Sequence, residues 1–582
     1  MMDTTKIDFD SLFAGMQQWL PFFSIGPGAS QVVETSPQDA GVDARRLLEL
    51  AGQFYVQQFG VWGSTFGDAS GRETVSGGKG DRRFDADQWK RYPLFDYIRQ
   101  SYLLTSKSLL EAVDLAWRDE RSKEQIRFVT RQFIDAMSPA NFALTNPEVL
   151  SLAVETNCEN FSTGLKNFLQ DMEKGGISLT SDAAFDVGGN LANTPGGVVY
   201  VNDLIQLIQY HPVTEHVKTV PLLIIPSVVN KYYILDLSPE ASLVRYLVSE
   251  GFTVFMISWR NITPALRQLT WEDYVDTGVL GALDVVRKIS KCDQINTVGY
   301  CVGGALLSSA LAVRAAQGKR PAASMTLLMT MLEFSDPGEI GVYLNPAFMA
   351  QREAIYAGGG IVSGKELTLA LSSLRANDLI WSFVVDNYLK GKTPDAFDLF
   401  YWNTDESNLP GPMFAWYLRH CYIENKLVEP GALTMLDTSV DLRQIGLPTY
   451  VFAASEDHLV PWKTAYESVN HLEGTIEFVL GGGGHITGPI NPPSKNKRHY
   501  WIGGLVGENA EDWRASAQLE NGSWWPHWGE WLGTHSGNDV LAPSKLGSSR
   551  YKEIETAPGR YAKSRTSGTT QVWSVNSLKI GA

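Results

Sequence analysis

A cysteine framed by glycines lies between a predicted strand and a predicted helix, and this junction constrains the fold more than any other segment. It reads Gly299-Tyr300-Cys301-Val302-Gly303, after the apolar run Ile295–Tyr300 and before the small-residue helix pattern Gly303–Ala316. Glycines on both sides let strand and helix approach without Cβ clashes. The pattern is that of a nucleophile elbow with cysteine in place of serine. Taken alone, it fits a buried structural cysteine as well as a nucleophile.

Two later segments supply the partners that a nucleophile needs. A predicted strand runs into an acidic turn at Tyr450–Asp457, and another runs into a glycine-rich turn that ends in a histidine at Phe478–His485. Nucleophile, acid and base occur in this order in the α/β-hydrolase fold. A histidine oriented by a carboxylate is what activates a thiol. We therefore predict a catalytic triad of Cys301, Asp457 and His485.

Alternatives exist for the acid and for the base. Glu456 is also acidic, but Asp457 has the shorter side chain typical of this loop and is favoured. His458 is adjacent to Asp457, so we expect it to shape the pocket wall rather than act as the base. The remaining candidates lack a catalytic context and are expected to be packing or surface residues: Cys158, Cys292, Cys421, His211 and His216.

Two backbone amides are predicted to form an oxyanion hole. One belongs to Val302, the residue after the nucleophile. The second should come from the loop after the strand Pro221–Pro226, and we assign it to Val228. That loop lacks the glycines common in hydrolases. Beyond His485 lies a small basic cluster that could meet a coenzyme A phosphate, although a solvated loop is the favoured interpretation; it comprises Lys495, Lys497 and Arg498.

Short apolar runs alternate with helical patterns after residue 180, which predicts an α/β architecture with a parallel sheet. The expected catalytic domain is 181–582. The predicted strands are Pro221–Pro226, Thr253–Ser258, Ile295–Tyr300, Met325–Met331, Pro448–Ala453 and Ile476–Leu480, with a helix over Trp271–Ile289. Roughly 115 residues separate the fourth and fifth of these strands, far more than an ordinary crossover. We predict a cap or lid inserted at about 333–447.

Residues 1–180 show helical patterns and no strand-like alternation, for example over Tyr97–Trp117 and Lys123–Met137. They predict a mainly α-helical N-terminal domain whose first 80 residues are variable. The Gly/Ser-rich stretch Gly60–Gly80 is predicted to be a loop or linker.

Composition excludes several classes of protein. The net charge is −15, from 49 basic and 64 acidic side chains, which disfavours a nucleic-acid binder. Four cysteines without metal-ligand spacing indicate a reduced, cytoplasmic setting and predict neither a metal nor a cofactor. The start, Met1–Asp10, lacks the features of a secretory signal, and no apolar run is long enough to span a membrane. Seventeen tryptophans make an apolar interface or surface plausible.

Beyond the elbow, many segments resemble those of the poly(3-hydroxyalkanoate) synthases. The resemblance runs from about Asp81 to about Lys563. The segments that carry it are Asn230–Leu237, Ile257–Asn261, Gly299–Gly304, Asn377–Trp381, Glu456–Trp462, Gly484–Ile486, Ile490–Pro493, Gly522–Pro526 and Ala557–Tyr561.

The resemblance implies a reaction and its setting. The form Gly-Tyr-Cys-Val-Gly-Gly and the chain length resemble class I enzymes (polyhydroxybutyrate polymerases), which favour short-chain monomers. Such an enzyme polymerises (R)-3-hydroxyacyl-coenzyme A into polyester through an acyl-cysteine, with coenzyme A thioester as substrate and no cofactor. It also implies a homodimer, a cap that opens, residence at the surface of cytoplasmic polyester granules, and contact with granule-associated proteins. Trp416 matches a position tied to dimerisation.

Some positions depart from the family pattern. Ser227 replaces a second proline, and Gly483-Gly484-His485 replaces a small residue or serine before Gly-His. Residues 1–80 and 564–582 are not family-like. Two other functions stay open: a cysteine hydrolase or thioesterase, which would release free 3-hydroxy acid, and an inactive granule-binding protein that uses the Trp-rich C-terminal region.

Overall fold

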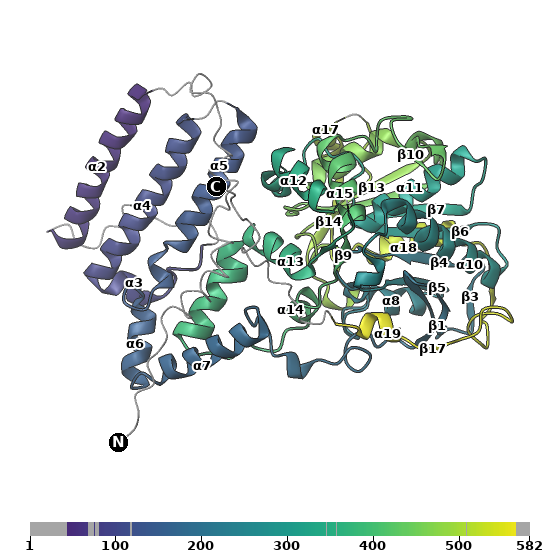
Figure 1. The fold of residues 1–582 in the computed structure, drawn as a ribbon, viewed down its shortest axis with the longest axis horizontal. Coiled ribbons are helices and arrows are strands. Elements are labelled where there is room, and N and C mark those ends of the chain that lie inside the picture. The colour runs from purple at the N-terminus through teal and green to yellow at the C-terminus, as the bar shows by residue number, and fades with distance from the viewer. Residues whose placement is uncertain are drawn as a thin grey trace, which may run out of the picture. The chain divides into compact units, whose positions relative to one another are not determined.

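The computed structural model describes residues 44–67, 75, 81–116, 119–344, 346–356, 358–507 and 509–565. The chain divides into two compact units, Met1–Leu150 and Ser151–Ala582 (Figure 1). This division falls earlier in the chain than the domain boundary expected near residue 180.

The described part of the first unit is helical and contains no strand. Its small core includes Phe84, Trp89 and Leu103, and the half-buried Arg83 forms ion pairs with Asp81 and Asp135. The expected loop at Gly60–Gly80 is wrong at its start: residues 60–66 end a long helix, and most of the others lie outside the described residues. The helices are α2 (Ala44–Phe66), α3 (Asp87–Arg91), α4 (Pro93–Ala116), α5 (Glu120–Ala136) and α6 (Pro147–Glu155), the last of which continues into the second unit.

An eleven-stranded sheet forms the centre of the second unit, in the order β15-β14-β13-β12-β7-β6-β4-β5-β2-β1-β17. The six predicted strands are its central members β4, β5, β6, β7, β12 and β13, and they pair in parallel. The strands are β1 (Gly196–Val201), β2 (Ile205–Tyr210), β4 (Leu222–Ile225), β5 (Val254–Trp259), β6 (Ile295–Tyr300), β7 (Ala322–Leu328), β12 (Thr449–Ala454), β13 (Ile476–Gly481), β14 (His499–Ile502), β15 (Gln518–Asn521) and β17 (Glu555–Thr556).

Antiparallel strands extend the parallel centre on both sides, so the sheet is mixed rather than purely parallel. β2 pairs antiparallel with β5 and β1 with β2, while β14 and β15 extend the other side. The predicted first strand is therefore not the first in the chain. His216, which lacks a catalytic context in the sequence, lies in β3 (His216–Lys218), which pairs with β16 (Asp539–Leu541).

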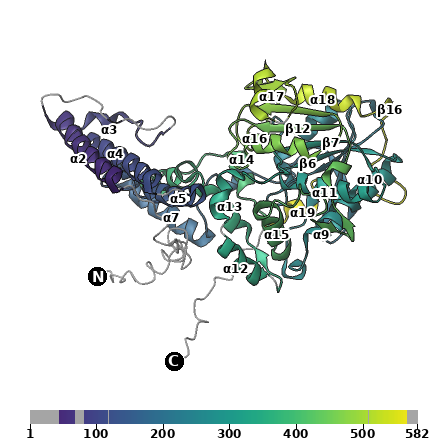
Figure 2. The ribbon, with the colours of Figure 1, turned by 90° about the horizontal axis from the view of Figure 1, so that it is seen from above.

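Alternate residues of the central strands face two separate cores. Leu223 and Ile225 of β4 pack into one, whereas Leu222 and Ile224 pack into the other. Figure 2 shows β6, β7 and β12 between α18 on one side and α11 on the other. Burial on both faces is why these strands are mostly apolar rather than alternating. The covering helices include α8 (Leu243–Ser249), α9 (Trp271–Asp273), π-helical η6 (Tyr274–Leu280), α10 (Gly281–Ser290), α11 (Val302–Ala316), α16 (Trp462–Glu467), α17 (Ala510–Ser516), α18 (Trp525–Thr534) and α19 (Gly559–Lys563).

The long segment between β7 and β12 forms the predicted cap, and it is mainly helical. Three of its helical segments, η8, η9 and η10, are π-helical. Its elements are η7 (Gly338–Tyr343), α12 (Pro346–Tyr356), β8 (Ile361–Val362), α13 (Gly364–Ser373), η8 (Asn377–Trp381), η9 (Val384–Leu389), α14 (Asp398–Asn403), β9 (Leu409–Pro410), α15 (Gly411–Tyr417), η10 (Leu418–Ile423), β10 (Thr434–Met435), β11 (Thr438–Ser439) and η11 (Leu442–Gln444).

Helix α7 (Glu159–Lys174), expected in the N-terminal domain, packs on this cap. The Asn160 side-chain amide donates to the Leu389 carbonyl at 2.8 Å, and the Tyr388 hydroxyl donates to Asp171 at 2.7 Å. At Gly164 a Cβ would lie 1.9 Å from the Tyr388 carbonyl oxygen. The close approach of α7 to η9 therefore requires glycine at this position.

Candidate active site

Cys301 lies at the turn between β6 and α11 in a backbone conformation that side chains rarely adopt, with φ 53° and ψ −125°. Its N–H donates to the Leu328 carbonyl at 2.9 Å, and its own carbonyl accepts from the Gly304 N–H and the Thr330 hydroxyl. The surrounding structure thus holds the residue in this conformation. Such strain is concentrated at functional sites.

The glycines around Cys301 are required by close backbone contacts. A Cβ at Gly299 would lie 2.4 Å from the Gly304 Cα, and one at Gly303 would lie 2.2 Å from the Ile225 carbonyl oxygen. The first contact allows α11 to pack directly on β6. The second brings the loop after β4 against the start of α11. The elbow expected from the sequence therefore has the geometry that its glycines predict.

His485 and Asp457 follow β13 and β12 and meet beside the elbow. The His485 Nδ1 lies 2.7 Å from Asp457 Oδ2, and the Asp457 side chain is fully buried. The other carboxylate oxygen accepts the N–H groups of Leu459 and Val460 at 2.8 and 3.0 Å. These bonds fix the carboxylate, which in turn fixes the imidazole. Glu456, the alternative acid, is exposed, and its N–H bonds to the Gly483 carbonyl.

Electrostatics favour a charged imidazole at this position. Burial by itself lowers the pKa of His485, but the charge of Asp457 and the interaction with the Cys301 thiol outweigh it and hold that pKa well above its ordinary value. Hydrogen bonding of the imidazole to both Asp457 and Cys301 acts in the same direction. The structure thus brings the three predicted residues into one interacting group.

His458 lies near this group and differs from His485 in its charge state. Burial lowers the pKa of His458 to about 4, and the nearby cations Arg375 and His485 add to this, against the opposing charge of Asp457. His458 is therefore neutral and lies near Arg375 of the cap. This agrees with the expectation that it shapes the pocket wall.

Two cap tyrosines lie close to the nucleophile, and the sequence did not single them out. Burial raises the pKa values of Tyr417 and Tyr422, and the Cys301 sulfur adds to this effect in both. Tyr417 stacks on Trp271 with ring centroids 5.1 Å apart, and Phe334 packs edge-on against Tyr422 at 4.8 Å. The cap thus places an aromatic, largely apolar wall beside Cys301. The sequence drew attention only to their neighbour Trp416, which matches a family position.

A partly buried hydrogen-bond cluster joins the end of η10 to the segment that follows β7. The Asn425 side-chain amide donates to the Glu333 carboxylate, and its oxygen accepts the Phe334 N–H at 2.8 Å. The Ser335 N–H and hydroxyl also donate to Glu333. Because η10 immediately precedes Asn425, this cluster fixes the segment that carries Tyr422.

The two predicted oxyanion donors lie in the turn after β6 and in the loop after β4. Val302 opens α11, and the first N–H groups of a helix have no partner within it. Val228 is buried in the loop after β4, which Gly303 approaches closely. The next amide, that of Val229, donates to the Ser227 hydroxyl at 3.3 Å.

The other sequence candidates lie outside the triad. Burial raises the pKa of Cys421 and makes it a poor thiolate, whereas Cys158 is exposed. Trp416 stacks on Trp271 at 4.9 Å. In the basic cluster, Lys495 and Lys497 are exposed, and the Arg498 guanidinium reaches the Gly482 carbonyl beside the histidine loop.

The described residues lack two kinds of feature. They contain no helix that is both long and apolar enough to cross a membrane. They also contain no group of three or more histidine, cysteine, aspartate or glutamate side chains that could hold a metal ion.

This sheet order, the strained cysteine elbow and the histidine–aspartate pair define an α/β-hydrolase-fold enzyme with cysteine in the nucleophile position. Residues 220–492 match the family described as "alpha/beta hydrolase fold". Residues 80–247 match "Poly-beta-hydroxybutyrate polymerase (PhaC) N-terminus".

Several similar proteins can be aligned with most of the chain. The "Poly(3-hydroxyalkanoate) polymerase subunit PhaC" of Cupriavidus necator is 46% identical over 502 residues, which cover 85% of this chain and 85% of the relative. The "Poly(3-hydroxyalkanoate) polymerase" of Methylorubrum extorquens is 39% identical over 86% of this chain and 84% of its own. The "Poly(3-hydroxyalkanoate) polymerase subunit PhaC" of Rhizobium meliloti is 36% identical over 90% of this chain and 86% of the relative. The chain belongs to the poly(3-hydroxyalkanoate) polymerase family.

Proposed function

We propose that this enzyme polymerises (R)-3-hydroxyacyl-coenzyme A, with 3-hydroxybutyryl and other short-chain monomers preferred, and releases coenzyme A. The observation that carries the proposal is the interacting group of Cys301, His485 and Asp457 at the elbow of a polymerase-family chain. The intermediate is an acyl-Cys301 thioester.

The first half-reaction transfers the acyl group to the enzyme. His485 takes the thiol proton of Cys301, and its raised pKa favours the resulting thiolate–imidazolium pair. The sulfur attacks the substrate thioester carbonyl, and the oxyanion accepts hydrogen bonds from the amides of Val302 and Val228. Collapse breaks the bond to the coenzyme A sulfur, which takes the proton from His485. One thioester replaces another, so this exchange is nearly balanced in energy.

The second half-reaction forms the ester. Neutral His485 accepts the proton of a 3-hydroxyl group, whose oxygen attacks the acyl-Cys301 carbonyl. The new C–O bond forms as the C–S bond breaks, and the released thiolate regains its imidazolium partner. General-base assistance of this kind contributes about 10²–10⁴-fold. Asp457, fixed by two backbone amides, keeps the imidazole oriented throughout.

The cap supports polymerisation over hydrolysis. The rings of Tyr417 and Tyr422 pack against Trp271 and against each other beside the nucleophile, and they occupy space that water would otherwise fill near the acyl-cysteine. A cap of this kind must move to admit a coenzyme A ester and to pass the growing chain. A thioesterase is the competing function, and it would have to supply a water molecule at the same place.

The surroundings of the enzyme belong to the same proposal. We place the enzyme in the cytoplasm at the surface of the polyester granule, as a homodimer, without a cofactor. Lys495, Lys497 and Arg498 are candidates for contact with a coenzyme A phosphate.

Product analysis with purified full-length enzyme tests the function. With 3-hydroxybutyryl-coenzyme A, we expect release of coenzyme A together with insoluble polyester. A panel of longer 3-hydroxyacyl chains should react progressively more slowly. Free 3-hydroxy acid as the main product would instead establish a thioesterase, and granule binding without coenzyme A release would establish an inactive binding protein.

A further inference from the structure

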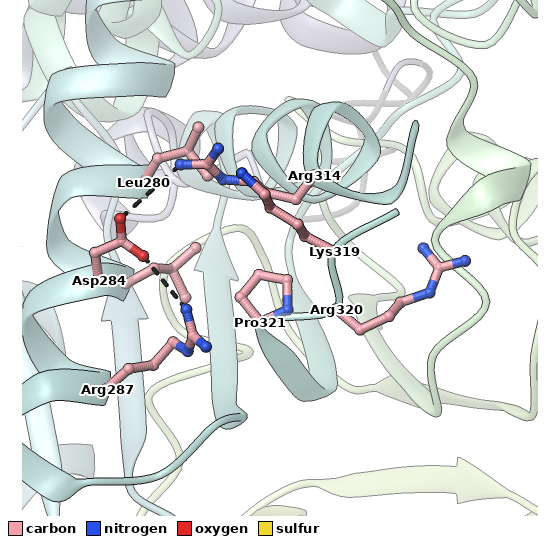
Figure 3. Close-up of a pocket in the computed structure, with 8 residues that line it drawn as sticks. Leu280, Asp284, Arg287, Arg314, Lys319, Arg320 and Pro321 are labelled. Carbon is pink, nitrogen blue, oxygen red and sulfur yellow. Dashed lines mark hydrogen bonds and ion pairs between the residues drawn. The ribbon is translucent and has the colours of Figure 1, made fainter. Parts of the chain in front are cut away.

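A hollow of about 420 Å³, lined largely by cationic side chains, lies between α10 and α11 (Figure 3). We call it the cationic hollow. Its volume falls in the range of small-molecule sites. Its lining residues are Leu280, Leu283, Asp284, Arg287, Arg314, Lys319, Arg320 and Pro321.

The lining carries four cations and one carboxylate in a protein whose net charge is −15. Asp284 lies between two arginines, and both ion pairs are long: 3.4 Å to Arg287 and 4.0 Å to Arg314. Figure 3 shows Asp284 on one side of the hollow, joined to both. A single carboxylate shared at these distances leaves most of the positive charge unneutralised.

Two of the four cations are stabilised by their position at the C-terminal end of a helix. Arg287 and Arg314 lie in the last turns of α10 and α11, where the helix dipole stabilises positive charge. Each also has a polar partner: Arg287 donates to the Asp293 carbonyl at 2.6 Å and Arg314 to the Gln317 side chain at 3.0 Å.

The other two cations are not stabilised by a helix end or, among the described residues, by an ion pair. Lys319 and Arg320 follow the end of α11, and both are exposed. Within the described part of the chain, neither has a carboxylate partner. In Figure 3 Pro321 lies between Asp284 and Arg320, so the two arginine–aspartate pairs and Arg320 border the hollow from different sides. Several cations that border one hollow, with too little negative charge among them, suit an anion with more than one charge.

The cationic hollow is distinct from the catalytic centre. Helix α11 has 15 residues and begins immediately after Cys301. At 1.5 Å per residue its two ends are about 22 Å apart. Arg314 and Lys319 are at the far end, and Pro321 directly precedes β7, so the hollow lies at the edge of the sheet opposite to Cys301.

We propose that the cationic hollow is a second binding site, for a small ligand that carries a diphosphate group. Phosphate oxygens match the paired N–H donors of guanidinium groups, and a diphosphate places several negative charges in a compact volume. The side chains of Leu280, Leu283 and Pro321 add an apolar floor. The diphosphate belongs either to a nucleotide or to an inorganic phosphate chain.

Calorimetric titration of the full-length enzyme with inorganic pyrophosphate and with ADP tests this proposal. We expect both to bind the native enzyme. The double variant Lys319→Gln/Arg320→Gln should raise the Kd of both ligands by about tenfold or more, because two unpaired cations are lost. Asp284→Asn should lower the Kd about threefold, since it removes the competing carboxylate. Tighter binding of ADP than of pyrophosphate identifies a nucleotide, and equal binding identifies an inorganic chain.

Matched controls keep the result interpretable. Lys288→Gln/Lys291→Gln makes the same change of charge on neighbouring residues outside the lining and should leave both Kd values unchanged. Unaltered coenzyme A release by Lys319→Gln/Arg320→Gln shows that this variant is folded. Three results would overturn the proposal: no binding of either ligand, equal weakening by the control pair, or equally tight binding of a Glu-rich peptide of the same charge.

Discussion

At the scale of single residues, the charge of Asp457 sets the state of the catalytic imidazole. Asp457 is buried beside His485 and raises its pKa. Asp457→Asn keeps the shape but removes the charge, so the pKa of His485 should fall. Because the imidazolium is needed to protonate the leaving coenzyme A, the alkaline limb of the pH–rate profile should move to lower pH.

The rate of coenzyme A release by Asp457→Asn should also fall, by about 10²–10⁴-fold. Initial rates measured across the pH range check both effects. Glu456→Gln is the matched control, since Glu456 is the exposed neighbour. If Glu456→Gln moved the alkaline limb and Asp457→Asn did not, the acid would be wrongly assigned.

Asp236 is a buried carboxyl that the proposed reaction does not use. Burial raises its pKa to about 6, although hydrogen bonds from Ser242 and Thr194 oppose this. Its ordinary value is 3.8. Folding therefore disfavours the ionised form, and the stability associated with the neutral carboxyl is lost as pH rises from about 4 to about 6.

Asp236→Asn should remove this dependence on pH. Relative to the native enzyme, its free energy of unfolding should rise by up to about 3 kcal/mol between pH 4 and pH 7. Denaturant titrations of both proteins at several pH values give this difference. A difference that stays constant over this range would mean that Asp236 is not raised in pKa.

At the scale of elements, the packing of the elbow depends on the absence of a Cβ at Gly303. A Cβ there would lie 2.2 Å from the Ile225 carbonyl oxygen. Gly303→Ala should therefore push α11 away from the loop after β4, lower the melting temperature and displace the Val302 amide from the oxyanion. We expect a loss of coenzyme A release of at least about tenfold.

Gly533→Ala in α18 is the comparison for Gly303→Ala. No atom lies within 4 Å of the added Cβ, so this variant should be neutral or stabilised by about 0.5–1 kcal/mol. Thermal unfolding and coenzyme A release are measured for both variants. Native activity in Gly303→Ala would contradict the account of the elbow.

The cap depends on Asn425, which has φ 49° and holds Glu333. Asn425→Ala leaves a buried carboxylate with fewer donors and should cost about 1–3 kcal/mol of stability. Asn425→Gly removes the same hydrogen bonds but tolerates the positive φ, so it should be less destabilising by about 1 kcal/mol. Unfolding free energies of the two variants separate the hydrogen bonds from the backbone conformation.

The elements that sequence patterns predicted are those whose residues are buried on both faces. The central strands β4 to β7, β12 and β13 are mostly apolar and largely buried, and helix α11 follows its glycine-framed start. Among the flanking strands that escaped prediction, β1 and β15 carry a weak signal. β1 begins with two glycines, and β15 is exposed along its whole length. Edge strands need no continuous apolar run.

At the scale of the whole molecule, the grouping of the three proposed triad residues was predictable and its surroundings were not. Cys301, Asp457 and His485 each follow a central strand, and parallel strands bring their carboxyl ends to one edge of the sheet. Tyr417 and Tyr422 reach Cys301 only because a long insertion folds back over that edge. Their position depends on tertiary packing within the cap, which no local pattern specifies.

The proposed reaction passes through an acyl-Cys301 intermediate, and detection of this intermediate is the most direct test of the proposed function. Full-length enzyme is mixed with 3-hydroxybutyryl-coenzyme A, quenched in acid at short times and digested for mass spectrometry. We predict one or more 3-hydroxybutyryl units on the peptide that contains Cys301 and none on the peptide of the buried Cys421. Cys301→Ala should carry no acyl group and release no coenzyme A, whereas Cys421→Ala should retain both properties. Polymer formation by Cys301→Ala at the native rate would contradict the central claim.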